Sequence, residues 1–142
     1  MTQKDKDLLL KDLCARLPYG VKILHEGWNY ECDDELSTIE RVVGIDDKFI
    51  YTKVIDTHNG EEYRDDKRPI DTFDDKLFLR PMSSMTEEEK KELTELCDVI
   101  YSFGAKIYNK TPKFYDWLNA HHFDYRGLIS MGLALEAPKD MY

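Results

Sequence analysis

Cysteine and glycine are scarce in the sequence, and neither residue type forms a recognisable motif. The three cysteines, Cys14, Cys32 and Cys97, lack the CxxC spacing of metal and redox sites. An odd number of cysteines without a disulfide-like pattern fits a reducing compartment. The seven glycines form neither GxGxxG nor GxxxxGK, so the common phosphate-binding loops are excluded. The sequence therefore predicts no cofactor and no metal site.

Long apolar runs are also missing. The chain begins with MTQKDKDLLLKDLC, in which the longest apolar run has three residues and is flanked by charged side chains. This pattern is unlike a secretory signal peptide, and no stretch approaches the length of a membrane span. We therefore expect a soluble, cytoplasmic protein that does not enter a membrane.

Basic residues are outnumbered by acidic ones. The chain has 29 acidic and 20 basic side chains and a net charge of −9, and residues 21–81 alone contain sixteen acids and nine bases. A surface of this sign repels phosphate backbones, which disfavours nucleic-acid binding. The alternative, a nucleic-acid accessory factor, would need a local basic patch, for which Lys67, Arg68 and Arg80 are the candidates.

Hydrophobic periodicity predicts a helix at the start of the chain and strands after it. An apolar stripe at helical spacing predicts a helix over residues 3–17, which the following PYG ends. The stripe consists of Leu10, Leu13, Cys14 and Leu17. The runs rich in β-branched and aromatic residues, which predict strands, are 21–26, 37–45, 48–55 and 76–80. The dipeptide Asn59-Gly60 adds the signal of a tight hairpin turn.

A long helix is predicted after the strands. Thr86 and Glu89 form a capping box, and three acids follow in the first turn, where the helix dipole favours them. The apolar stripe includes Cys97, which we expect to be inert packing. The helix is predicted to end near 102–106, because Gly104 weakens it.

Two shorter helices are predicted beyond this point. Thr111 before Pro112 is a start signal, because it places a capping side chain directly ahead of a proline at the first helical position. Asp124 is expected to cap a last short helix over 125–131. Residues 133–142 are expected to form a tail.

Together these elements predict an α+β fold that forms one compact unit. Residues 1–20 give an N-terminal helix, residues 21–81 an acidic antiparallel β unit, and residues 82–142 a helical C-terminal part packed on it. Short strands with a long early loop and a turn before the last strand resemble the pattern of an SH3-like barrel. The alternative is a plain curled antiparallel sheet. The acidic and aromatic signature of peptide-binding SH3 domains is missing, so the pattern implies no proline-rich ligand.

The chemically richest stretch is WLNAHHFDYRGLI, residues 117–129, which contains two adjacent histidines. Neighbouring residues lie about 100° apart on a helix, which places His121 in the apolar stripe and His122 at its edge. The residues four positions on are Tyr125 and Arg126, so the i, i+4 spacing of zinc helices is absent. We therefore interpret His121 as a packing residue.

The alternative is a small enzyme or metal protein that uses His121, His122, Asp124 and Arg126. A catalytic His–Asp pair needs a nucleophile, and no serine of the chain lies in a GxSxG elbow. Asp124 also fits a helix cap, and Arg126 an exposed or ion-paired base. The sequence thus predicts no enzymatic activity and leaves this stretch as an alternative site.

Aromatic side chains stand out in the predicted loop GWNYECDDE. Aromatic residues exposed in a long loop serve as anchors for a partner, and the alternative is that Trp28 folds back over the core. The acidic surface around them suits a partner protein with a basic surface. The predicted binding residues are Trp28, Tyr30, Asp33, Asp34, Asp65 and Asp66. Cys32 lies in the same loop and is expected to be exposed.

Four segments of the chain are similar to a recurring set of short proteins from phages, prophages and mobile elements of gut anaerobic bacteria. These segments are RLPYGV (16–21), FLRPMSSMTEEE (78–89), WLNAHHFDYRGLI (117–129) and MGLALEAPKDMY (131–142). The resemblance implies a setting, a small cytosolic accessory protein of a mobile genome that binds a host or phage protein. The combined prediction is a non-enzymatic protein-interaction module.

Overall fold

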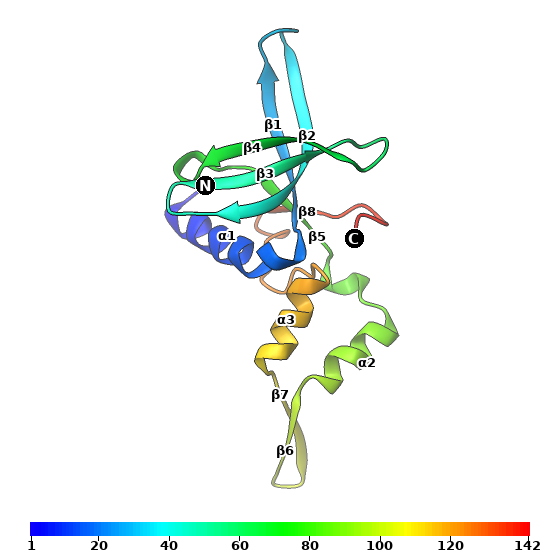
Figure 1. Ribbon diagram of the computed structural model, residues 1–142. Coiled ribbons are helices and arrows are strands. Elements are labelled where there is room, and N and C mark those ends of the chain that lie inside the picture. Colours follow the sequence, from blue (N-terminus) through cyan, green and yellow to red (C-terminus); the bar gives the residue numbers. More distant parts are fainter.

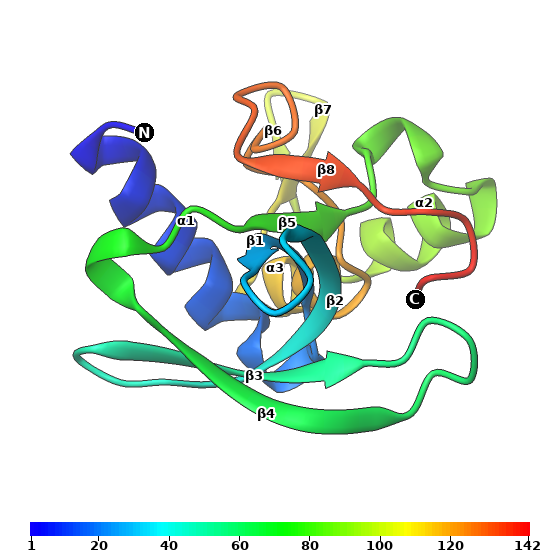
Figure 2. The same cartoon turned by 90° about the horizontal axis from the view of Figure 1, so that it is seen from above.

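A curved, mixed β-sheet forms the body of the protein. The computed structural model describes residues 1–142, the side chain of residue 29 excepted. The sheet has the order β4-β3-β2-β1-β5-β8, and all neighbours are antiparallel except the parallel pair β5–β8. Its strands are β1 (Lys22–Asn29), β2 (Asp34–Ile45), β3 (Phe49–Ile55), β4 (Glu62–Pro69), β5 (Lys76–Leu79) and β8 (Ala134–Glu136). Seen from above in Figure 2, β3–β4 and β5–β8 lie on opposite sides of the β1–β2 hairpin, so the sheet curls without closing.

The inner face of the curl holds the main apolar core. Buried and less buried residues alternate along β2 and β3, as the two-residue period of a strand requires. One end of this face is apolar and packs against α1 (Gln3–Arg16), as Figure 1 shows. The buried residues of this core are Leu9, Leu13, Val21, Ile23, Val42, Ile50, Phe73, Leu77, Leu79, Leu128, Leu133 and Ala134.

Helix α1 confirms the predicted N-terminal helix but turns a different face inward. It begins at a capping box in which Thr2 accepts from the backbone N–H of Asp5. Its buried residues are Leu9, Asp12, Leu13 and Arg16. Cys14, predicted to pack inside, is exposed. The predicted buried face was wrong because the buried side chains of α1 include the ion pair of Asp12 and Arg16. A search for apolar residues at helical spacing does not detect buried charged residues.

The C-terminal part forms a second, smaller core. The predicted helix starts at Thr86 and Thr111 are confirmed, since both side chains cap the helices that follow them, α2 (Glu87–Glu95) and α3 (Pro112–Ala120). These helices pack around a cluster that consists of Met85, Leu93, Phe114, Leu118 and Phe123. This cluster is connected to the main sheet at Arg80, whose backbone forms an isolated parallel β-bridge with Phe123.

The prediction of a mainly helical C-terminal part was wrong in three places. Helix α2 ends at Glu95 rather than near 102–106, and the chain continues as a hairpin, β6 (Asp98–Ser102) and β7 (Ala105–Asn109). Residues 125–131 form turns rather than a helix. The expected tail at 133–142 contains β8, which adds an edge strand to the main sheet.

The coarse fold class is therefore confirmed as α+β with an N-terminal helix, whereas the barrel is not. The segment 64–68, for which no strand was predicted, is part of β4, and the predicted loop at 27–35 is mostly the long hairpin of β1 and β2. Within the described part of the chain, no helix is long and apolar enough to cross a membrane.

Candidate functional site

The β6–β7 hairpin is the most exposed apolar element of the molecule. Its two strands pair only with each other, and Figure 1 shows them projecting beyond α2 and α3. Ile100 lies opposite Ile107 on one face, and Val99 lies opposite Tyr108 on the other, so both faces carry apolar side chains. The large hydrophobic residues that stand exposed on it are Val99, Ile100, Tyr101, Phe103, Ile107 and Tyr108. A two-stranded hairpin with both faces in water is marginally stable on its own.

The tip of this hairpin holds an aromatic residue in an unfavourable backbone conformation. Phe103 has φ +48° and Gly104 has φ +74°, so both turn residues are left-handed. Such two-residue turns favour Asn or Asp followed by Gly, and a bulky side chain at positive φ is an outlier. The Phe103 side chain is fully exposed at 108%. The turn therefore presents a strained, unpacked aromatic ring at the outermost point of the hairpin.

Lysines lie in β7 and in the residues that follow it. The Lys106 ammonium lies 5.3 Å from the centre of the Tyr108 ring, and the Lys110 ammonium lies 5.5 Å from that of Phe114. Residues 98–113 contain three lysines and one aspartate. This segment therefore has a net charge of +2, whereas the adjacent helix α2 contains five glutamates and two lysines.

The β1–β2 hairpin places four of the predicted binding residues together at its tip. Trp28 is 46% exposed and Tyr30 is 89% exposed, which confirms that Trp28 does not fold back over the core. Asp33 occupies the turn with φ +53°, and Asp34 begins β2. Beside Trp28 lies a hollow of about 340 Å³. Its lining residues are Glu26, Gly27, Trp28, Glu35, Leu36 and Ser37.

The other two predicted binding residues lie elsewhere and already have partners. Asp65 is in β4 and pairs with Lys53 across to β3 at 3.0 Å. Asp66 lies 3.7 Å from Arg64 and 3.6 Å from Arg68, measured between charged atoms. The tip residues and these two carboxylates therefore belong to different surfaces.

A buried polar cluster fills the other end of the curled sheet, and sequence analysis missed it. The Glu40 carboxylate is fully buried and accepts from Thr38 Oγ1 (2.8 Å), Thr52 Oγ1 (2.6 Å) and Arg68 Nη2 (2.6 Å). Three strands thus contribute to one saturated carboxylate. The sequence did not indicate this cluster. Polar residues that alternate along a strand are typical of a face turned to solvent, so their burial was not expected.

A histidine and a second carboxylate extend this cluster. His25 Nδ1 lies 2.8 Å from Asp75 Oδ1, and Arg68 Nε lies 3.0 Å from Asp75 Oδ2. Burial raises the pKa of the Asp75 carboxyl, while the hydrogen bond to His25 and the charge of Arg68 oppose the rise. A Cβ on Gly27 would lie 3.0 Å from His25 Nε2, so glycine leaves room for the imidazole. The cluster ties β1, β2, β3 and β4 to the segment before β5.

The basic residues proposed for nucleic-acid binding are engaged in these and other contacts. Arg68 is buried in the polar cluster. Arg80 donates to Glu89 at 2.9 Å, and its guanidinium lies 4.1 Å from the centre of the Phe123 ring. The Lys67 ammonium lies 4.6 Å from the centre of the Phe49 ring. The three cations do not form a common patch.

The two histidines of the alternative site make separate packing contacts. His121 is half-buried, donates from Nδ1 to the Trp117 carbonyl (2.9 Å) and stacks on that indole at 3.9 Å. His122 is only 4% exposed and stacks on Tyr142 at 3.6 Å. The predicted order, with His121 inside and His122 at the edge, was therefore wrong. Helix α3 ends at Ala120, so helical angles do not extend to either ring.

The remaining residues of that site hold the chain in place. Asp124 accepts from the backbone N–H groups of Leu128 (2.8 Å) and Ile129 (2.9 Å), so it stabilises a turn and not the helix that was predicted to follow it. Arg126 donates from Nε to Asp12 at 2.9 Å. Among the described residues, no group of three or more His, Cys, Asp or Glu side chains is placed to hold a metal ion.

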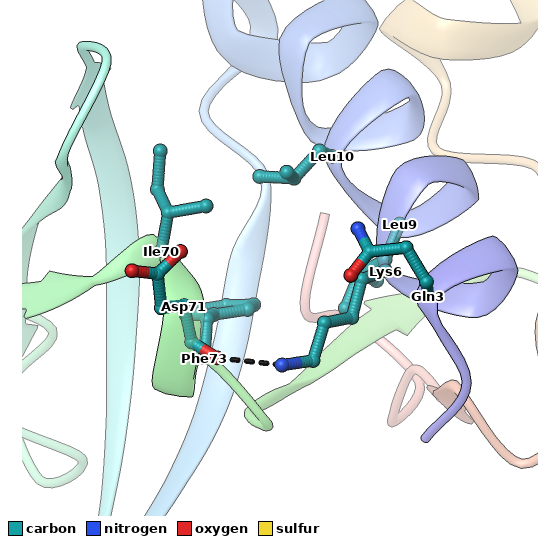
Figure 3. A pocket seen from close by; sticks show the side chains of 7 residues that line it. All are labelled: Gln3, Lys6, Leu9, Leu10, Ile70, Asp71 and Phe73. Carbon is teal, nitrogen blue, oxygen red and sulfur yellow. Dashed lines mark hydrogen bonds between the residues drawn. The ribbon is translucent and has the colours of Figure 1, made fainter.

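One further hollow lies between α1 and the turn before β5. Figure 3 shows the Lys6 side chain reaching across it to donate to the backbone oxygen of Asp71 at 2.5 Å. The hollow measures about 240 Å³, below the usual range of ligand pockets. Its lining residues are Gln3, Lys6, Leu9, Leu10, Ile70, Asp71 and Phe73. We interpret it as a joint between helix and sheet.

The two exposed hairpins are therefore the candidate functional surfaces. No protein-family model, no curated protein and no solved structure matches the chain. The β6–β7 residues were missed because Ile100 and Ile107 also fit a helical stripe. Alternating β-branched and aromatic residues on both sides of Phe103-Gly104 were the signal that predicts a hairpin.

Proposed function

We propose that the protein is a non-enzymatic protein-interaction module and that β6–β7 is its principal docking element. The observation that carries this proposal is Phe103, a fully exposed aromatic residue at φ +48°. A left-handed conformation at a residue other than glycine costs on the order of 1–3 kcal/mol, and such strain clusters at functional positions. Burial of the ring against a partner offsets that cost.

The energetics of the hairpin support a docking role. Burial of a large apolar side chain contributes about 1.5–3 kcal/mol, and aromatic residues dominate the binding energy of interfaces. The hairpin presents six such side chains, three of them aromatic, on a short two-stranded scaffold. Exposed apolar surface of this kind on a soluble chain marks an interaction site.

The condition of the alternative catalytic residues also supports a binding function. His121 and His122 are each stacked on an aromatic ring, and both oxygens of Asp124 accept backbone hydrogen bonds. These contacts engage the side chains in the packing of the fold. We infer that the stretch 117–129 is structural.

We further infer a setting for the module and an SH3-like pattern for its β unit. The strand order β5-β1-β2-β3-β4, with a 3-10 turn at Ile70–Thr72 before β5, supports that pattern. The partner is a host or phage protein, the location is the cytoplasm, and the protein is an accessory factor of a phage or mobile element. The acidic β1–β2 hairpin, with Trp28 and Tyr30 exposed, favours a basic surface on the partner.

The proposal is tested by crosslinking in cells that express the protein. A photo-crosslinking amino acid at position 103 is expected to yield a discrete covalent adduct with one polypeptide. The matched control carries the same amino acid at Tyr63, an exposed residue of β4 far from the hairpin in Figure 1. Position 63 should give no adduct of that mass.

A second variant separates the side chain from the turn. Phe103→Asn keeps a residue that tolerates positive φ, so β6–β7 should form at least as well. With the crosslinker moved to Tyr101, the adduct yield of this variant should fall at least tenfold, because the Phe103 ring that anchors the partner is missing. Equal adducts from positions 103 and 63, or none from 103, would contradict the proposal.

A further inference from the structure

The open edges of the main sheet are protected against pairing with another chain. Strand β4, at one edge, has six charged residues among its eight, ends at Pro69 and pairs with β3 across a bulge. Strand β8, at the other edge, has only three residues. The projecting part of the β1–β2 hairpin carries five acidic side chains within residues 26–36. Charge, proline, bulges and short length are the features that keep edge strands from pairing between molecules.

The edges of the β6–β7 hairpin are not protected in this way. Each strand has five residues, of which one is charged and none is proline. The register runs without a shift from the Asp98↔Asn109 pair to the pair that flanks the turn. Large apolar side chains stand exposed on both faces of the hairpin. An exposed, regular and apolar edge of this kind is a template for a strand of another chain.

The hydrogen-bond pattern of a hairpin determines which backbone groups of β7 face outward. A two-residue turn is closed by hydrogen bonds between the residues that flank it, and opposite pairs then alternate between hydrogen-bonded and non-hydrogen-bonded. Ser102 and Ala105 flank the turn of this hairpin. By this alternation, Lys106 and Tyr108 belong to non-hydrogen-bonded pairs, so their backbone N–H and C=O groups point away from β6. These two residues therefore offer donors and acceptors to a further strand.

The outer edge of β7 is complementary to itself. In an antiparallel pair of two β7 strands centred on Ile107, Lys106 of each copy would lie opposite Tyr108 of the other. The ammonium group and the tyrosine ring would then form a cation–π contact on each side of the centre. Because Ile100 already lies opposite Ile107 within each hairpin, the pairing would produce a row of four isoleucines on one face. The pairing places no like charges directly opposite each other.

We propose that two copies of this chain associate through their β7 edges, antiparallel and about a twofold axis at Ile107, so that the two hairpins form one four-stranded sheet. The same register sets Gly104 of each copy opposite Lys110 of the other, which brings the exposed Phe103 ring against the second copy. The proposal rests on the docking role of β6–β7 given above, and it identifies what covers this hairpin while another partner is absent.

The charge and the stability of the hairpin suit a second copy. Residues 98–109 contain one aspartate and one lysine, so the two hairpins meet without net charge. A two-stranded hairpin is marginally stable in water, whereas a sheet of more strands with a shared apolar face is not. The contact uses the same surface of both copies and therefore closes at a dimer. The strands are short, so the contact is small and weak and requires a high concentration of the protein.

Two proline variants, one at each edge of the hairpin, test the proposal. Tyr108→Pro removes an outward N–H group of β7, and Val99→Pro removes one from the directly opposite residue of β6. Proline is tolerated where the N–H faces solvent, so both variants keep the hydrogen bonds between β6 and β7. Sedimentation velocity is measured from micromolar to near-millimolar concentration. We expect the wild type and Val99→Pro to approach the mass of a dimer, and Tyr108→Pro to dimerise at least tenfold more weakly.

Engineered cysteines test the register without a change of backbone. The three native cysteines are first replaced by serine. Ile107→Cys should then form a disulfide-linked dimer in air, because the twofold axis sets the two Cα atoms about 4.5 Å apart, within the range that a disulfide spans. Asn109→Cys is the matched control on the same face, and it should remain unlinked, because its counterpart lies at the far end of the paired strands.

Each outcome decides for or against pairing through β7. A wild type that stays monomeric, a Tyr108→Pro variant that dimerises like the wild type, or equal disulfide formation at positions 107 and 109 overturns it. If both proline variants are monomeric, the disulfides decide: a link at 107 and none at 109 upholds the pairing, and any other pattern overturns it. An adduct of position 103 with a different polypeptide in cells would uphold the interaction function even where the purified protein is monomeric.

Discussion

Asp12→Ala is expected to lower the free energy of unfolding by about 3–5 kcal/mol, the cost of leaving a buried charge without its partner. Asp12 and Arg16 are both fully buried, and the Arg16 Nε donates to Asp12 Oδ2 at 2.7 Å. Arg16 Nη2 also donates to the backbone oxygen of Phe123 at 2.8 Å. The variant leaves the guanidinium charge in the interior with only this neutral acceptor and the Tyr125 ring 5.6 Å away.

The measurement is equilibrium unfolding in urea, followed by tryptophan fluorescence, with an exposed ion pair as the matched control. Arg41 and Glu62 form a close pair whose side chains are 35% and 32% exposed. Glu62→Ala should cost less than about 1 kcal/mol, because water replaces the lost partner. Similar losses for Asp12→Ala and Glu62→Ala would contradict the reasoning from burial.

A double variant identifies the cause of the loss. Asp12→Leu combined with Arg16→Met removes both charges and keeps similar volume, so it should be more stable than Asp12→Ala. Arg126, whose side chain is only 18% exposed, then loses its Asp12 contact and has to turn toward solvent. A double variant less stable than the single one would contradict the assignment of the loss to an unpaired buried charge.

The Asp12–Arg16 pair stands at a junction of segments that are distant in the sequence. Arg16 belongs to RLPYGV and contacts Phe123 in WLNAHHFDYRGLI. The backbone of Arg80, in FLRPMSSMTEEE, donates to the His122 carbonyl and accepts from the N–H of Asp124. Three of the four segments that the sequence analysis singled out therefore meet in one place, where their residues stabilise a joint.

The fourth segment completes the same joint. The Tyr142 hydroxyl donates to the Phe78 carbonyl and accepts from the Lys22 N–H, both at 2.9 Å. Lys22 Nζ donates to the Met141 carbonyl at 2.7 Å. Burial raises the pKa of Tyr142, because ionisation would leave a charge among these backbone groups. The stretch expected to be a tail thus fastens β1 to β5.

Local chemistry was predictable from the sequence, and long-range pairing was not. The helix starts at Thr86 and Thr111 followed from side chains that act within three residues. The end of α2 did not, because Ile100 fits both a helical stripe and a strand, and the choice depends on the Phe103-Gly104 turn.

The candidate site divides along the same line. The aromatic residues Trp28 and Tyr30 could be named as candidates from the sequence, but the choice between exposure and packing over the core depended on a hairpin that was predicted as a loop. The buried carboxylate of Glu40 was not, because its partner Arg68 lies 28 residues away and reaches it only when the sheet curls. Charge neutralisation across such a distance leaves no periodic signal in the sequence.

The second large effect concerns His122 and the stability of the protein in acid. Burial, followed by the charges of Arg16 and Lys22, lowers the pKa of His122 from 6.5 to about 4. The folded state therefore prefers the neutral imidazole, and its stabilising effect is complete above the unfolded pKa. As the pH falls from 6.5 to 4, the unfolded state takes up a proton that the folded state excludes. We expect this group alone to reduce the free energy of unfolding by about 3 kcal/mol over that window.

His122→Asn isolates this contribution. Asparagine tolerates the left-handed backbone at this position, where φ is +59°, and it does not titrate. The variant should be less stable than the wild type at pH 7, because the stack on Tyr142 is lost. Urea unfolding at several pH values should show a stability that falls much less between pH 6.5 and pH 4. The control His58→Asn, in the exposed turn between β3 and β4, changes no buried contact and should keep the wild-type slope. An unchanged slope in His122→Asn would show that the imidazole accepts its proton inside the fold, and that the stack on Tyr142 can hold a cation.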